Sequence, residues 1–134
     1  MKFLGIDFGL KRIGLALSDS QGKVVLPFTT LKNSKGVENR IKKLVEERKI
    51  EAIVIGLPKD LKNNSTSMTQ EVEKFAKKLK KILNIPIYFQ DEKLTSFEAE
   101  ERLKHAGIPL KKGKKIIDQL AAVEILEDFL NNHV

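Results

Sequence analysis

Apolar residues in the first quarter of the chain form short runs and two-residue alternations, a pattern typical of β-strands. The pattern spans residues 3–7, 12–19 and 23–31, and Pro27 interrupts the third segment. Residues 19–22 are Asp, Ser, Gln and Gly, a composition that favours a turn. We therefore expect three consecutive strands joined as an antiparallel meander.

The pattern then changes to alternating helices and strands. Apolar residues over 37–45 fall on one helical stripe, and a second stripe runs over 72–83 after a helix start near Ser67. The apolar runs 52–57 and 85–89 predict two further strands, the first of them central and parallel.

Two helices are predicted in the last third of the chain. Thr95 and Glu98 fit a capping box, which predicts a helix that begins there and ends near Gly107. Residues 110–115 read Leu-Lys-Lys-Gly-Lys-Lys and are expected to form a basic loop. Residues 116–130 then carry the apolar stripe of a final helix.

The order of elements, β-β-β-α-β-α-β-α-α, predicts an α/β fold. We expect a mixed five-stranded sheet, in which parallel strands join the antiparallel meander, flanked by helices. The chain has 134 residues and shows neither an internal repeat nor a linker, so we expect one domain over 1–134.

Composition excludes several classes of site. The chain has no cysteine and two histidines, His105 and His133, which excludes disulfide scaffolds, thiolate zinc sites and thiol nucleophiles and disfavours a Ser-His-Asp triad. The first carboxylate comes at Asp7, too early for a signal peptide, and no apolar run approaches the roughly 20 residues of a membrane span. We expect a cytoplasmic protein with no membrane partner.

The formal net charge is +7, which favours a polyanionic partner such as nucleic acid. The same excess of lysine could instead belong to a Lys- and Glu-rich surface of the kind found in thermophilic proteins. Net charge alone leaves both interpretations open.

Acidic residues stand at three places where they could carry chemistry. Asp7 ends one strand, Asp91 and Glu92 end another, and Asp118 lies inside an apolar helical stripe. Carboxylates gathered at the carboxyl edge of a sheet need cations, and all-oxygen ligands suit Mg²⁺ or Mn²⁺. Two such ions about 4 Å apart can activate a water and stabilise the leaving oxygen of a phosphodiester. Each acid alone also has a structural interpretation: a turn at Asp7, a solvated Glu92, or helix-dipole pairing at Asp118.

An acid-x-Gly hairpin such as Asp7-Phe8-Gly9 also holds nucleotide phosphate in actin-like ATPases and sugar kinases. Those proteins close two such domains around ATP, whereas 134 residues supply one. A small ATPase therefore stays a minor alternative, which a titration with ATP would test.

Four motifs in register cover nearly the whole chain. They are Gly-Ile-Asp-Phe-Gly through to Ala over 5–16, Val-Ile-Gly-Leu-Pro over 54–58, Asp-Glu-Lys-Leu-Thr-Ser over 91–96, and Asp-Gln-Leu-Ala-Ala through to Leu over 118–126. Together they resemble the YqgF family, also called RuvX and described as Holliday junction resolvases. Each motif is modest alone, and their common order makes the resemblance specific.

The resemblance implies an RNase H-like fold related to RuvC resolvases and a metal-dependent nuclease activity. The matching catalytic and metal-binding acids are Asp7, Glu92 and Asp118. Apart from the resemblance, we consider the neighbouring Asp91 as a candidate further metal ligand. The resemblance favours processing of the 5′ end of pre-16S rRNA in ribosome biogenesis, so the expected partners are pre-rRNA and the ribosome precursor. The expected cofactor is Mg²⁺ or Mn²⁺.

The sequence departs from the family pattern in three places. Lys93 replaces the usual Arg and Ser96 the usual second Thr, and both keep the charge or the hydroxyl. The loop 59–65 lacks the Gly that relatives often carry. RuvC-type enzymes also carry a catalytic Glu where this chain has Gly56-Leu57, so the resemblance implies that Glu92 takes over that ligand role.

Basic residues near these acids are candidate nucleic-acid contacts. Arg12 follows the hairpin of Asp7 and could contact a phosphate or lie free on the surface. A tight basic cluster next to the helix of Asp118 could attract a phosphate backbone by counterion release, or simply be solvated; it consists of Lys111, Lys112, Lys114 and Lys115. A further cluster is interpreted as the solvated face of its helix; it consists of Lys77, Lys78, Lys80 and Lys81.

Two other functions stay open at this point. The chain could resolve branched DNA as a Holliday junction resolvase, which calls for a two-fold dimer to make paired cuts. It could also be a nucleic-acid-binding module that has the fold but does not cleave. The sequence leaves the oligomeric state unknown.

Overall fold

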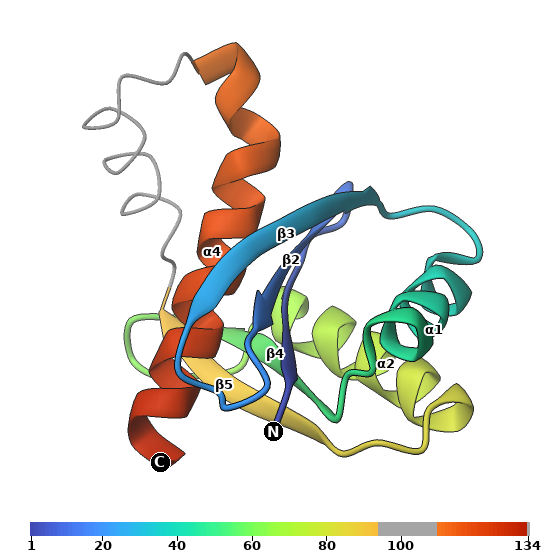
Figure 1. Ribbon diagram of the computed structural model, residues 1–134. Coiled ribbons are helices and arrows are strands. Elements are labelled where there is room, and N and C mark those ends of the chain that lie inside the picture. The colour runs from blue at the N-terminus through green and yellow to red at the C-terminus, as the bar shows by residue number, and fades with distance from the viewer. Residues whose placement is uncertain (94–109, 134) are drawn as a thin grey trace.

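The computed structural model describes residues 1–93 and 110–133 of the chain (Figure 1). The helix predicted from Thr95 to near Gly107 lies outside the described residues. The elements are β1 (Phe3–Phe8), β2 (Arg12–Ser18), β3 (Val25–Lys32), α1 (Val37–Arg48), β4 (Ala52–Lys59), α2 (Ser67–Ile82), β5 (Ile87–Lys93) and α4 (Leu110–His133).

The five strands form one mixed sheet with the order β3-β2-β1-β4-β5. The first three strands pair as the predicted antiparallel meander, and β4 and β5 add to β1 in parallel. Strand β1 is therefore central, because it pairs with β2 on one side and with β4 on the other. The expected mixed five-stranded sheet is confirmed.

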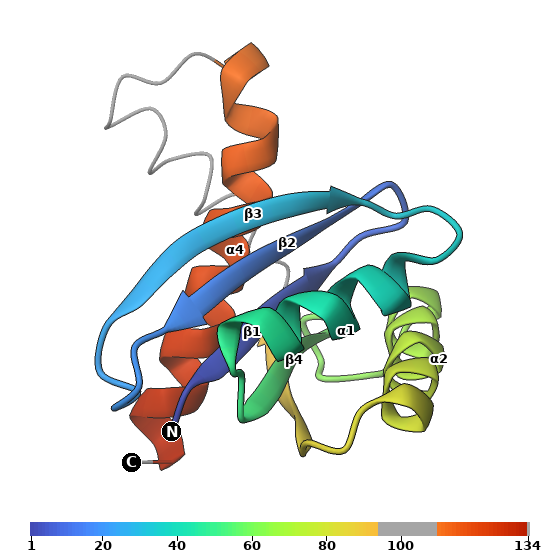
Figure 2. The ribbon, with the colours of Figure 1, turned by 45° about the vertical axis from the view of Figure 1, so that its right-hand side comes forward.

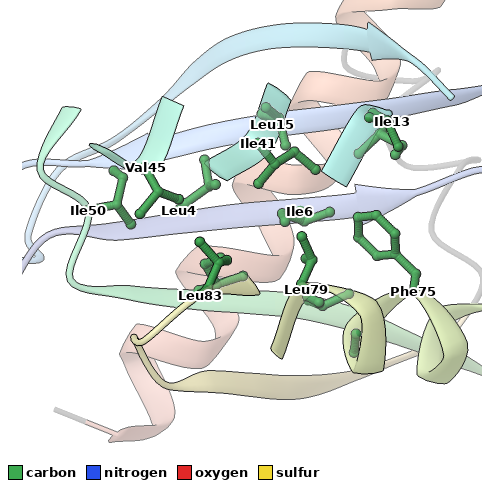
Figure 3. Packing of buried hydrophobic residues seen from close by; sticks show 14 of the residues in the cluster. Leu4, Ile6, Ile13, Leu15, Ile41, Val45, Ile50, Phe75, Leu79 and Leu83 are labelled. Atoms are coloured by element: carbon green, nitrogen blue, oxygen red, sulfur yellow. The ribbon is translucent and has the colours of Figure 1, made fainter. Parts of the chain in front are cut away.

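Helices cover both faces of the sheet: α1 and α2 lie on one face and α4 on the other (Figures 1 and 2). Side chains of β1 point alternately to the two faces of the sheet, and so to the two layers of helices. Leu4 and Ile6 join the main core against α1 and α2, where Ile41 and Leu79 also pack (Figure 3). On the other face the apolar residues of α4 form a second cluster with the sheet; its buried members are Val54, Ile125, Leu126, Phe129 and Leu130.

Strand boundaries differ from the sequence pattern at β4 and β5. Strand β5 starts at Ile87 and continues to Lys93, because it pairs with β4 over its whole length, from Ile53–Ile87 to Lys59–Lys93. Asp91 and Glu92 thus lie within a strand and not after its end. Pro27 does not end β3, because β3 is an edge strand and takes up the proline at a register shift.

The prediction of a basic loop over 110–115 is wrong. These residues form the first turns of α4, which begins at Leu110 and not at residue 116. Leucine and lysine are good helix formers, and Gly113 costs the helix only about 1 kcal/mol relative to alanine. The lysines of the segment, Lys111, Lys112, Lys114 and Lys115, therefore lie on a helix N-terminal to Asp118.

Within the described residues, no helix combines the length and the apolar character that crossing a membrane requires.

Candidate active site

Asp7 lies near the end of the central strand β1, on the face of the sheet that α4 covers. It lies two residues after Gly5, whose α-carbon faces Ala122 and Leu126 of α4, so the alternation of the strand directs Asp7 to the same side. Its partner in the antiparallel register with β2 is Gly14.

Glycines on three neighbouring strands let α4 lie directly on the sheet. A Cβ atom on Gly14 of β2 would overlap the carbonyl oxygen of Asp118. On Gly5 of β1, a Cβ would come within 2.9 Å of the carbonyl oxygen of Ala122. On Gly56 of β4, a Cβ would overlap the side chain of Ile125. This close packing seats Asp118 over Gly14, and therefore beside Asp7.

Glu92 reaches the same place from β5. It pairs with Pro58 of β4 in the parallel register, and both residues line one cavity of about 450 Å³. Asp7 and Asp118 line the same cavity, and one carboxylate oxygen of Glu92 is buried. The full lining is Asp7, Phe8, Gly56, Pro58, Lys59, Asp60, Thr66, Ser67, Met68, Glu92, Ile117, Asp118, Ala121 and Ile125.

The electrostatics of the cavity depend on close like charges and on the arginine that pairs with one of them. Burial, with a smaller contribution from the Asp118 carboxylate, raises the pKa of Asp7 to about 7. The Arg12 guanidinium donates from Nε to Oδ2 of Asp118 at 2.8 Å. Asp118 lies two turns into α4, beyond the first turn, so pairing with the helix dipole does not account for it.

The structure does not bring Asp91 into this cavity. Its neighbour Glu92 takes the cavity side of β5, so Asp91 points to the opposite face of the sheet. Asp91 contacts the cavity wall through Lys59, whose Nζ donates to Asp91 Oδ2 at 3.2 Å, and the aspartate side chain is half exposed.

The loop between β4 and α2 supplies lining residues that the sequence pattern did not single out. Asp60 Oδ1 accepts hydrogen bonds from the backbone N–H groups of Lys62 and Asn64, which fixes the loop. Thr66 caps α2 in a capping box with Thr69, whose hydroxyl donates to the Pro58 carbonyl oxygen. The sequence contained one indication of these lining residues: the polar loop follows an apolar strand, at the carboxyl edge of the sheet where sites usually lie.

The donor set fits a divalent cation in its chemistry. Asp7, Glu92 and Asp118 offer only carboxylate oxygens, and a cation would offset the repulsion between Asp7 and Asp118. In the residues that the structure describes, no three His, Asp or Glu side chains are grouped so that they could hold an ion together. A cation that uses Asp118 would compete with Arg12 for this carboxylate.

Solved structures of two resolvases share this fold. The fowlpox virus Holliday junction resolvase matches with a TM-score of 0.60 and 13% identity over 100% of both chains. RuvC of Thermus thermophilus, in complex with a Holliday junction substrate, matches with a TM-score of 0.59 and 13% identity over 98% of this chain and 95% of that chain. These matches define the class of fold: it is RNase H-like and of the RuvC type.

Sequence comparison gives the family within this class. The family model described as "RuvX: Holliday junction resolvase" matches residues 1–132. A protein of Streptococcus uberis named "Putative pre-16S rRNA nuclease" is 38% identical over 98% of both chains. One of the same name from Nitratidesulfovibrio vulgaris strain DP4 is 40% identical over 97% of this chain and 93% of its own. The chain belongs to the RuvX family, which confirms the resemblance found in its motifs.

Proposed function

We propose that this protein is a metal-dependent nuclease that processes the 5′ end of pre-16S rRNA in the cytoplasm. The observation that carries the proposal is that three acids, Asp7, Glu92 and Asp118, line one cavity. Full-length relatives named for pre-16S rRNA favour that RNA as the substrate.

In this proposal Asp7, Glu92 and Asp118 would hold Mg²⁺ or Mn²⁺, and to do so they would have to come closer together than they lie in the described structure. The metal would supply Lewis-acid stabilisation of the phosphodiester and activation of the attacking water. Glu92 stands on β5, beside the end of β4 where RuvC-type enzymes carry a catalytic Glu. The protein itself contributes a partly buried cavity, which strengthens charge interactions inside it.

Basic residues would bind the substrate around this cavity. Arg12 pairs with Asp118 at the edge of the cavity, and its side chain is 39% exposed, so a phosphate can reach its guanidinium. The lysines in the first turns of α4 precede Asp118 along the same helix and would attract the phosphate backbone; they are Lys111, Lys112, Lys114 and Lys115.

The test is cleavage of a pre-16S rRNA 5′ leader with Mg²⁺ or Mn²⁺, and again with EDTA. We expect metal-dependent cleavage that Asp7→Asn and Asp118→Asn abolish. Asp128→Asn changes an exposed acid on the same helix as Asp118 and should cleave as wild type does. Equal cleavage by wild type and Asp7→Asn would refute the site, whereas binding without any cleavage would support a non-catalytic nucleic-acid-binding module.

Resolution of branched DNA is the second candidate, because the matching family model is described as a Holliday junction resolvase. A resolvase needs two active sites related by a two-fold axis, so this function requires a dimer. Sedimentation together with cleavage of a synthetic four-way junction separates the two functions. A monomer that cuts the RNA leader and leaves the junction intact would exclude the resolvase.

A further inference from the structure

A second hollow lies on the side of the sheet that carries α1 and α2. It has a volume of about 420 Å³, and four lysines of α2 line it together with Phe8 and Phe75. We call it the lysine groove, after Lys74, Lys77, Lys78 and Lys81. Lys77 and Lys78 are adjacent, and each is separated from Lys74 and Lys81 by three or four residues, so the four form one stripe along the helix.

The stripe has an excess of positive charge. All four lysines are exposed, and Lys74 pairs with Glu71 at 3.7 Å. Within the part of the chain that the structure describes, Lys77, Lys78 and Lys81 take part in no ion pair. Unneutralised lysines this close together repel one another and favour an anion between them.

The groove adjoins the acid-lined cavity. Phe8 lines both hollows, and it directly follows Asp7 at the end of β1. Its ring packs on Phe75 of α2 with the centroids 4.7 Å apart, so the wall between the two hollows is fixed. Asn33 lines the groove as well, and its Nδ2 donates to the Gly9 carbonyl oxygen at 2.8 Å, which holds the adjoining hairpin.

We propose that the lysine groove binds the phosphate backbone of the nucleic-acid strand whose scissile bond lies in the cavity. This rests on the proposed function, and it assigns Lys77, Lys78 and Lys81 to substrate binding in place of a merely solvated helix face. From Lys74 to Lys81 the helix rises about 10 Å, a length of duplex axis along which one strand carries about three phosphates, at roughly 3.4 Å of axis per phosphate. A polyanion with regular charges therefore fits the stripe.

The test compares two triple variants with the same change in net charge. The groove variant carries Lys77→Gln, Lys78→Gln and Lys81→Gln. The control variant carries Lys23→Gln, Lys43→Gln and Lys80→Gln, all exposed lysines that line neither hollow. Lys80 is the sharpest control, because it belongs to the same helix and the same run of lysines.

Binding of a fluorescent pre-16S leader RNA is measured by anisotropy in EDTA from 50 to 300 mM KCl, apart from cleavage. Loss of three phosphate contacts should make the plot of the logarithm of the association constant against log [salt] less steep, by about 2 in slope. Binding should weaken about tenfold or more at 0.1 M salt. The control variant should keep the wild-type slope.

Equal slopes for the two triple variants would overturn the proposal that the lysine groove binds the substrate backbone. The groove would also be excluded as a substrate site if the groove variant kept its RNA affinity and lost only a protein partner. Failure of the proposed function would look different, since wild type would then fail to cleave while the difference in slope remained.

Discussion

Gly14 of β2 lies directly beneath Asp118 of α4, so closely that a Cβ atom on Gly14 would overlap the Asp118 carbonyl oxygen. Gly14 is also the register partner of Asp7. One glycine thus fixes how near the two acids of β1 and α4 can come. The contact joins residues more than a hundred positions apart in the chain, at the place where the chemistry is proposed.

Gly14→Ala should therefore push α4 away from the sheet and separate Asp118 from Asp7. We expect a loss of about 1–3 kcal/mol in the free energy of unfolding, as is usual for overpacking, and a loss of cleavage that exceeds the fraction unfolded. Urea denaturation and RNA cleavage measured on the same sample check this.

Gly36→Ala is the matched control for this substitution. Gly36 has a φ of 87° with no atom within 4 Å of a Cβ, so alanine costs only backbone strain there, about 1–2 kcal/mol. Activity per folded molecule should stay at the wild-type level. Wild-type activity in folded Gly14→Ala would contradict the positioning role of Gly14.

The sequence pattern identified the acids because each has a local signature. Asp7 interrupts an apolar strand, and Asp118 interrupts an apolar helical stripe, so their residue types stand out against their neighbours. The meander and the parallel strands followed from hydrophobic periodicity and turn composition, which are local as well.

Features that depend on distant partners could not be predicted in this way. Strand β5 continues past Phe89 because β4 offers pairing partners as far as Lys59. The need for glycine at Gly14 comes from α4, which follows about a hundred residues later. That Asp91 and Glu92 serve opposite faces depends on strand β5 continuing through both of them.

Asp7→Asn should stabilise the metal-free protein, and increasingly so as pH rises. The pKa of Asp7 is raised from 3.8 to about 7 in the folded state, so folding binds a proton and is favoured below pH 3.8. That advantage is lost as pH rises from 3.8 through about 7, on the order of 4 kcal/mol in total. Asparagine has no such dependence.

Urea denaturation of wild type and Asp7→Asn in EDTA between pH 4 and 8 measures this difference. The gain in unfolding free energy of Asp7→Asn over wild type should grow up to about pH 7 and then level off, while the variant is inactive throughout. A difference that stays constant with pH would show that Asp7 is ionised in the folded state over the whole range.

Glu92→Gln and Asp91→Asn form a pair of neighbouring substitutions on the two faces of β5. Glu92 lines the acidic cavity, so Glu92→Gln should lower kcat by roughly 10²-fold or more, as loss of a charge-stabilising group does. Asp91 pairs with Lys59 and is 54% exposed, so Asp91→Asn should leave kcat within a few-fold of wild type. Steady-state cleavage under saturating metal measures both values of kcat. A larger loss for Asp91→Asn than for Glu92→Gln would mean that Asp91, and not Glu92, is the acid that the reaction needs.

Arg12→Gln separates two roles of the arginine beside Asp118. The ion pair should add at most about 1 kcal/mol to stability, because the Arg12 side chain is 39% exposed and water screens the charges. If Arg12 also contacts a substrate phosphate, Arg12→Gln raises KM several-fold and lowers the salt slope of RNA binding by about 1. Arg12→Lys keeps the charge and should restore the slope. A fall in kcat with KM and slope unchanged would mean that Arg12 acts only by positioning Asp118.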